Sequence, residues 1–131
     1  MTRSFAFGDR TLDVWPPERE QIYAANAAAA AFYQRILKLA PEGEIARTYV
    51  AKRGLEPATV DAFKLGYAPN DWGALVAEFQ SSGIDLAIAE KTYLVKTGQR
   101  GYYDFNRGRL MIPTYATTGE IVAFGGRALD D

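Results

Sequence analysis

The sequence has 131 residues, of which 48% are hydrophobic and 13% aromatic, so it has the size of one ordinary domain and can bury a core. It contains neither cysteine nor histidine, which excludes zinc held by Cys and His, disulfides, a cysteine nucleophile and a histidine general base. No stretch has the pattern of a signal peptide or approaches the roughly 20 apolar residues of a membrane span, so we expect a soluble, cytoplasmic protein without a membrane partner.

Positive charge gathers toward the C-terminal end, although the net charge of the chain is only −1. Residues 1–90 contain nine Lys and Arg against twelve Asp and Glu, a net charge of −3. Residues 91–127 contain six against two, a net charge of +4. Local fields rather than net charge steer polyanions, so an anion-binding surface is expected at this end of the chain.

Helical patterns fill the N-terminal half of the sequence. Residues 1–15 show no period and are expected to be a flexible lead-in. Pro16 and Pro17 then open a helix that runs to about Leu39, with Asn26 and Tyr33 among its inward positions. The other elements expected here are helices at 44–52 (Ile45 and Tyr49 inward, Gly54 as its C-terminal cap), 57–63, 72–80 (capped by Asp71, ended by Gly83) and 86–91 (capped by Asp85), and a short strand at 64–68.

Strand patterns fill the C-terminal third. Residues 93–96 are expected to be extended and 98–101 to form a loop. Residues 110–112 and 121–124 are apolar at successive positions, as in strands covered on both faces, and 116–119 between them have the length of a hairpin turn. The sequence therefore predicts one α+β domain over residues 1–131, with a helical N-terminal half packed on a small antiparallel or mixed sheet that contains a C-terminal hairpin.

Three arginines lie at the ends of this expected hairpin. Arg107 and Arg109 lead into its first strand, and Arg127 leaves its second. The ends of antiparallel strands lie side by side, so these guanidinium groups can gather in one place. Gly125 and Gly126 add side-chain-free backbone that a phosphate or a base can approach closely. The simpler interpretation is that each arginine is solvated or paired with an acid; their joint position favours an anion-binding surface.

Aromatic residues close to these arginines in the sequence could stack on bases. They are Tyr102, Tyr103, Phe105 and Trp72, although aromatic residues in a domain of this size mostly belong to the core. Residues 44–63 also fit a helix-turn-helix, but its second helix is too short and too acidic to read a major groove. Neither paired carboxylates on a helix face nor a glycine-rich phosphate loop is found, so no catalytic residue is expected in this chain.

Two motifs in the sequence resemble segments of bacterial DnaG-type DNA primases. YVAKRGLEPATVDAFKLGYAPNDW, at 49–72, is similar to the family's Y-L-x-x-R-G-L helix end followed by F-x-[IL]-G-[YF]-A-P-x-x-W. YYDFNRGRLMIPTYATTGEIVAFGGRAL, at 102–129, is similar to Y-D-x-F-x-x-R-[IVL]-M-F-P-I-x-D-x-x-G-x-[IV]-[IV]-[GA]-F-G-G-R-x-L. The AAAAFYQRIL of the first helix also resembles the family's A-A-x-F-Y-x-x-x-L. Residues 16–131 are thereby identified as the N-terminal half of the RNA polymerase domain, immediately before the TOPRIM domain.

The resemblance implies a part of an enzyme that makes RNA primers for DNA replication, a nucleotidyltransferase. Its partners would be single-stranded DNA, the RNA–DNA hybrid and nucleotide triphosphates, with a replicative helicase recruited through other parts. The metals it implies are Mg or Mn in the TOPRIM domain and Zn in an N-terminal domain, and none in this chain. The residues it implies for nucleotide and template binding are Arg53, Arg109 and Arg127, with Arg107 at a commonly basic position. To these we add Lys52, the neighbour of Arg53, and we expect Tyr102 and Tyr103 to stack on bases because they are aromatic residues close to the arginines.

The sequence also departs from this family. The family's P-I-x-D is Pro113 to Ala116 here, which removes a charge from the turn, and Phe105 stands where an arginine is frequent. The zinc ligands, the TOPRIM carboxylates and the K-Y-x-N-S segment are absent, so we expect that this chain alone cannot make primers. A fragment of a primase is the first hypothesis, and a stand-alone nucleic-acid-binding or adaptor module with a primase-like fold is the alternative; an unrelated small-molecule enzyme is disfavoured.

Overall fold

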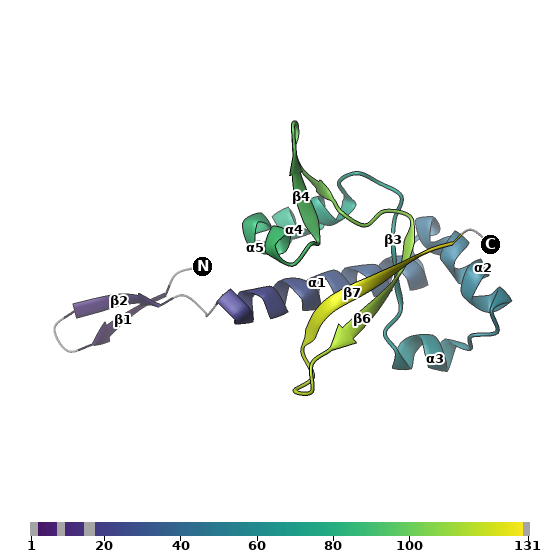
Figure 1. The fold of residues 1–131 in the computed structure, drawn as a ribbon, viewed down its shortest axis with the longest axis horizontal. Coiled ribbons are helices and arrows are strands. Elements are labelled where there is room, and N and C mark those ends of the chain that lie inside the picture. The colour runs from purple at the N-terminus through teal and green to yellow at the C-terminus, as the bar shows by residue number, and fades with distance from the viewer. Residues whose placement is uncertain (1–2, 8–9, 15–17, 130–131) are drawn as a thin grey trace.

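The computed structural model describes residues 3–7, 10–14 and 18–129, and within them it confirms an α+β fold (Figure 1). Helix α1 is the longest element, and the sheets are small and antiparallel. The elements in chain order are β1 (Arg3–Phe7), β2 (Arg10–Val14), α1 (Glu18–Leu39), a 3-10 turn (Pro41–Gly43), α2 (Glu44–Lys52), α3 (Pro57–Ala62), β3 (Gly66–Ala68), α4 (Ala74–Ser82), α5 (Leu86–Lys91), β4 (Val95–Gly98), β5 (Gly101–Asp104), β6 (Arg109–Tyr115) and β7 (Ile121–Ala128).

Helix α1 is the element on which the others pack. It runs behind the ribbon of β6 and β7, with α4 and α5 along one side and α2 and α3 at its C-terminal end (Figure 1). The inward positions expected from the sequence are confirmed, since Asn26 and Tyr33 are fully or almost fully buried. The Asn26 Nδ2 donates to the carbonyl oxygen of Ile121 at 2.9 Å, and its Oδ1 accepts from the Thr92 hydroxyl at 3.1 Å. This amide therefore fixes α1 to β7 and to the segment after α5.

Strands β3, β6 and β7 form the main sheet, in that order. The C-terminal hairpin is confirmed, and Gly119 in its turn has the positive φ of +100° that favours glycine. The expectation that both faces of this hairpin are covered is correct only near the start of β6, where Leu110 and Met111 are both buried in separate cores. Farther along, Ile112 and Val122 are 39% and 38% exposed, so the ribbon is not covered on both faces there.

Two hydrophobic cores meet at α1 and β6. The larger lies among α1, α4, α5 and β4 and includes Phe79, Leu94 and Met111. The smaller lies among the end of α1, α2, α3 and β3. Strand β3 lies so close to α1 that a Cβ added at Gly66 would be 2.5 Å from the Tyr33 Cβ. Glycine at position 66 is therefore a requirement of the packing.

The structure also contains two hairpins that the sequence analysis did not anticipate. Strands β1 and β2 pair within the segment expected to be a flexible lead-in. The prediction for residues 1, 2, 8, 9 and 15 lies outside the described residues, as does the prediction that Pro16 and Pro17 open the first helix. Strands β4 and β5 pair around residues 98–101, which were expected to be only a loop. Strands of four or five residues carry too little periodicity to be recognised.

Two local predictions were wrong for reasons that the packing explains. Helix α4 begins at Ala74 rather than at Trp72, and Asp71 does not cap it: its Oδ1 accepts from the Gly73 N–H at 2.8 Å, within the preceding turn. On α2, Ile45 is 57% exposed, and Ala46 is buried in its place because the helix packs one position farther round. No helix among residues 18–129 combines the length and the apolar character needed to cross a membrane.

Candidate nucleic-acid interface

Tyr49 brings together two of the arginines expected to bind phosphates. It lies on α2, and Arg53 follows four residues later on the same face, with its Cζ 5.0 Å from the centroid of the Tyr49 ring. From β7, the Arg127 Nε donates to the Tyr49 hydroxyl oxygen at 2.8 Å. Tyr49 is 8% exposed, whereas both arginines are exposed. A buried tyrosine thus positions two exposed guanidinium groups that come from positions 53 and 127.

Arg107 belongs to a second group of side chains, with Trp72 and Tyr103. Its Cζ lies 3.9 Å from the centroid of the Trp72 ring and 5.7 Å from that of Tyr103. The two rings are 5.6 Å apart at an interplanar angle of 65°. Trp72 is 66% exposed, although a large aromatic side chain normally seeks burial. Beside these rings lies a hollow of about 600 Å³ that Arg100 and Tyr102 also line. We call Trp72, Tyr103 and Arg107 the Trp72 cluster.

Asp104 fixes the Trp72 cluster to helix α4. Its carboxylate accepts from the N–H groups of Leu75 and Val76 at 2.8 and 3.0 Å, and so caps α4 from the end of β5. Its own N–H donates to the carbonyl oxygen of Trp72 at 2.8 Å. The side chain is 2% exposed, and burial raises its pKa above the ordinary value for an aspartate, against the lowering effect of the two hydrogen bonds. Asp104 therefore holds β5, which carries Tyr103, against the start of α4 through its carboxylate and against Trp72 through its backbone N–H.

Arg109 does not join Arg127, although their backbones are adjacent. Across β6 and β7, Arg109 is opposite Ala128 and Leu110 is opposite Arg127. Because side chains alternate between the faces of a strand, Arg109 and Arg127 lie on opposite faces of the ribbon. The Arg109 side chain passes over Gly126, where an added Cβ would be 3.2 Å from the Arg109 Cδ. The hairpin end thus carries one arginine on each face.

Lys52 and Tyr102 are the remaining predicted site residues, and neither belongs to the group around Tyr49 or to the Trp72 cluster. Lys52 is exposed at the end of α2 but shares a groove of about 460 Å³ with Glu44 and Leu129. Tyr102 is half-buried and packs against the larger core, so only part of its surface faces the hollow beside Trp72. Tyr103 is the member of the tyrosine pair that the structure unites with a cation.

The positive charge at these positions is not neutralised by neighbouring acids. Within the described part of the chain, Arg53, Arg107, Arg109 and Arg127 form no ion pair; the ion pairs found there are Arg35–Glu78, Lys38–Asp61 and Lys91–Glu18. Arg107 donates instead to the backbone carbonyl oxygen of Asp104. Over residues 18–129 there is also no group of three or more Asp and Glu side chains placed to hold a metal ion. The arrangement can bind phosphates and stack on bases.

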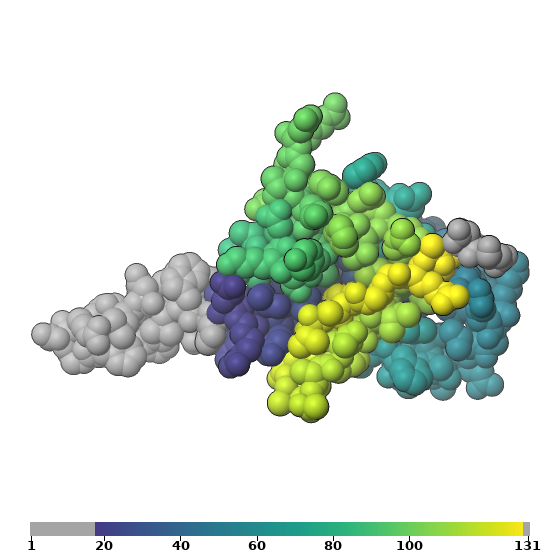
Figure 2. All heavy atoms as spheres, viewed as in Figure 1, coloured from purple at the N-terminus to yellow at the C-terminus, as the bar shows by residue number. Residues whose placement is uncertain are grey.

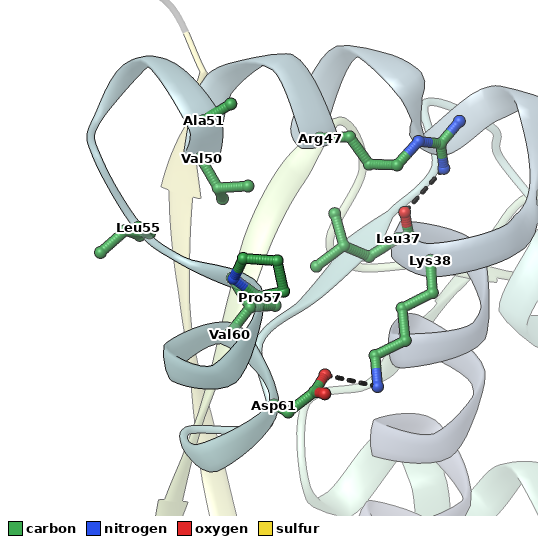
Figure 3. Close-up of a pocket in the computed structure, with 9 residues that line it drawn as sticks. All are labelled: Leu37, Lys38, Arg47, Val50, Ala51, Leu55, Pro57, Val60 and Asp61. Carbon is green, nitrogen blue, oxygen red and sulfur yellow. Dashed lines mark hydrogen bonds and ion pairs between the residues drawn. The ribbon is translucent and has the colours of Figure 1, made fainter.

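A separate apolar hollow of about 410 Å³ lies between the ends of α1, α2 and α3 (Figure 3). Its cations are already engaged: Lys38 pairs with Asp61 at 2.6 Å, and Arg47 donates to the carbonyl oxygens of Leu37 and Ala40 at 2.7 and 3.0 Å. Because Lys38 is already paired with an acid and Arg47 is turned toward backbone carbonyl oxygens, we do not count this hollow as part of the expected anion-binding surface.

Sequence reasoning missed Tyr49 and Asp104 as the residues that position the site. The spacing of Tyr49 and Arg53 was a usable signal, since residues four apart on a helix contact each other. The contact of Tyr49 with Arg127 depends on how β7 passes α2, and the cap from Asp104 depends on a contact across 29 positions of sequence. No local pattern reveals either contact.

The chain matches a known protein family and curated members of it. The family described as "DNA primase catalytic core, N-terminal domain" matches residues 32–131. The chain is 43% identical over 114 residues to the DNA primase of Myxococcus xanthus, and the matched segment covers 86% of this chain and 19% of that primase. The chain therefore spans about a fifth of the length of that curated relative.

Solved structures agree with this match. The RNA polymerase domain of Mycobacterium tuberculosis primase DnaG, in complex with a double-stranded DNA oligomer with a 6-nucleotide overhang, is 37% identical with a TM-score of 0.80, and the match covers 86% of this chain and 35% of that one. The DnaG primase catalytic domain bound to ssDNA is 30% identical with a TM-score of 0.79, covering 87% of this chain and 37% of that one.

Proposed function

This chain belongs to the family of the DNA primase catalytic core, N-terminal domain, and we propose that its basic surface holds single-stranded template DNA and incoming nucleotide triphosphates during primer synthesis. The whole primase would make RNA primers on DNA, and the RNA–DNA hybrid would pass over the same surface. Arginines and aromatic rings position phosphates and bases, whereas phosphoryl transfer by two metals requires clustered carboxylates. We therefore assign this chain binding, and assign catalysis to carboxylates elsewhere in the primase that would hold Mg or Mn.

The stacked pair of Arg107 and Trp72 is the strongest support for this proposal. A guanidinium 3.9 Å from the centroid of an indole ring that is 66% exposed presents a cation and an open aromatic face at one position. Single-stranded nucleic acid needs this combination, because every base has a π-face and every nucleotide has a phosphate. The related catalytic domain bound to ssDNA adds support from a protein of the same fold.

The pair of arginines around Tyr49 and the Trp72 cluster suit different parts of a polyanion. In the group around Tyr49, one N–H of Arg127 is used by the Tyr49 oxygen at 2.8 Å, and a guanidinium has five donors, so the others are free for phosphate oxygens. The neighbouring Arg53 doubles the charge. We propose that this pair binds phosphates, of template or of nucleotide triphosphate, and that the Trp72 cluster binds a base and its adjacent phosphate.

The test is binding of a fluorescein-labelled single-stranded oligonucleotide to the 131-residue chain, followed by fluorescence anisotropy. Trp72→Ala removes one stacking contact and should weaken binding by about 1–3 kcal/mol. Arg107→Ala should weaken binding and also reduce its salt dependence, because a phosphate contact is lost. The matched control is Arg35→Ala, because Arg35 is an exposed arginine held by Glu78 at 3.0 Å outside both groups. Equal binding by the parent, Trp72→Ala and Arg107→Ala would rule out this function for the cluster.

A further inference from the structure

Tyr93 occupies a backbone conformation that normally belongs to glycine. It follows the C-terminal cap of α5, has a φ of +62°, and donates its N–H to the Glu90 carbonyl oxygen at 3.1 Å. The next N–H, of Leu94, returns to the Ala89 carbonyl oxygen at 3.0 Å, which completes a Schellman motif. A side chain with a Cβ is strained at this position, and glycine would remove the strain. The tyrosine side chain is therefore present at a cost in stability.

The Tyr93 ring is not used by the core. It is 66% exposed, and its nearest aromatic neighbour is Phe105, which is itself 44% exposed. The two ring centroids are 6.5 Å apart. The Lys96 Nζ lies 5.3 Å from the centroid of Phe105, so a cation completes the group. We call Tyr93, Phe105 and Lys96 the Tyr93 cluster.

A small cavity links the Tyr93 cluster to the ribbon of the main sheet. The cavity has a volume of about 130 Å³ and is lined by both rings, by Asn106 and by Ala123 and Phe124 of β7. In Figure 2, green residues of the α5–β4 region lie directly against the yellow strand β7 on the face toward the viewer. The amide of Asn106 gives this cavity a donor and an acceptor for the edge of a base.

The Tyr93 cluster is continuous with the surface already described. Phe105, Asn106 and Arg107 are consecutive residues, and they serve the Tyr93 cluster, the cavity and the Trp72 cluster respectively. The Asn106 Oδ1 also lies 3.2 Å from the position that a Cβ would take at Gly126, as does the Cδ of Arg109. Arg109 is thus reached from the Tyr93 cluster through Asn106, and from the Trp72 cluster through the loop after β5.

We propose that the Tyr93 cluster is a second base-stacking site for single-stranded nucleic acid. The exposed ring of Tyr93 receives a base, Phe105 lies beside that ring at an interplanar angle of 53°, and Lys96 binds the adjacent phosphate. A strand held at the Trp72 cluster would pass Arg109 and continue onto this site. The inference rests on the proposed function, since it adds a site to the same surface. It also explains why an aromatic residue is present where glycine would be less strained.

Tyr93→Gly tests this proposal without weakening the fold. Because glycine relieves the positive φ, the urea midpoint of the variant should equal or exceed that of the parent. Affinity for an oligothymidine of about 12 nucleotides should fall roughly 5- to 100-fold, with an unchanged salt slope because no charge is removed. Lys96→Ala should flatten that slope by about 0.7. Tyr115→Ala, which removes a tyrosine 40% exposed near the far end of β6, is the matched control and should bind like the parent.

Photocrosslinking to an oligonucleotide that contains 5-iodouracil supplies an independent readout. Crosslinked peptides that contain Tyr93 or Phe105 would support the site. If Tyr93→Gly binds like the parent while Trp72→Ala is weakened, and crosslinks reach only the Trp72 cluster, the second site is refuted and the proposed function stands; the exposed rings would then suit a protein partner. If neither variant nor parent binds single strands, the proposed function itself fails.

Discussion

Replacement of Asp104 by alanine would test how the Trp72 cluster is held. The change removes the only side-chain cap of α4 found among the described residues and leaves the N–H groups of Leu75 and Val76 without their acceptor. Two buried unpaired donors cost about 1–3 kcal/mol each, and removal of a buried carboxylate returns part of that cost. We therefore expect a net loss of about 2 kcal/mol, from the 5–15 kcal/mol that is typical of a domain.

The assay is urea unfolding followed by circular dichroism. With a dependence on urea of about 2 kcal/mol per molar, a loss of about 2 kcal/mol lowers the midpoint by roughly 1 M. Asp71→Ala is the control, because Asp71 is exposed and accepts only from Gly73 within the turn, so it should cost under about 1 kcal/mol. Asp104→Ala should also weaken binding of single strands, because loss of the carboxylate cap loosens the start of α4, and Trp72 lies two residues before that helix. An Asp71→Ala variant as destabilised as Asp104→Ala would refute the assignment of the cap.

The pH dependence of the same residue, the packing of Gly66 and the hydroxyl of Tyr49 give three further predictions. Burial raises the pKa of Asp104, so the contribution of this side chain to stability is complete below the unfolded pKa and declines as the pH rises through the folded pKa. The urea midpoint of the parent minus that of Asp104→Asn should therefore be larger at about pH 4 than at pH 7. A difference that grows with pH would contradict this. Gly66→Ala would place a Cβ 2.6 Å from the Tyr33 carbonyl carbon and should lower the free energy of unfolding by about 1–3 kcal/mol or more. Gly73→Ala is the control and should lower it far less, because no heavy atom lies within 4 Å of the new Cβ. Equal urea midpoints for the two variants would contradict the packing at Gly66. Tyr49→Phe keeps the ring beside Arg53 but removes the oxygen to which Arg127 donates, so it should lower the free energy of unfolding by about 0.5–1.5 kcal/mol. It should weaken binding of single strands less than Arg127→Ala does. An unchanged urea midpoint would mean that this hydrogen bond does not contribute to stability.

The fold was largely predictable because its main elements have strong local signals. Neighbouring residues determine the long period of α1, the glycine at position 54 with its φ of +75°, and the cap of α5 by Asp85, which accepts from the Ala87 N–H at 2.9 Å. The hairpin β4–β5 was missed because its strands have four residues each, too few for a period to stand out.

The candidate site was predictable in its residue types but not in its grouping. Arg107, Arg109 and Arg127 could be recognised from the charge distribution and Arg53 from the family resemblance, and Arg53 and Arg127 are indeed brought together at Tyr49. Sequence placed Arg109 with them because the ends of antiparallel strands are adjacent. The register puts Leu110 opposite Arg127, and a shift of one residue moves a side chain to the other face. Such a shift is set by the whole sheet, which a short apolar pattern does not specify.

The salt dependence of single-strand binding tests the nucleic-acid surface most directly. With three to four phosphates bound by Arg53, Arg107, Arg109 and Arg127, the slope of log K against log salt should lie between about −2 and −3, and each arginine-to-alanine variant should flatten it by roughly 0.7. Arg35→Ala should leave the slope unchanged. A parent slope near zero, or four alanine variants that all keep the parent slope, would contradict the assignment of these arginines to a polyanion.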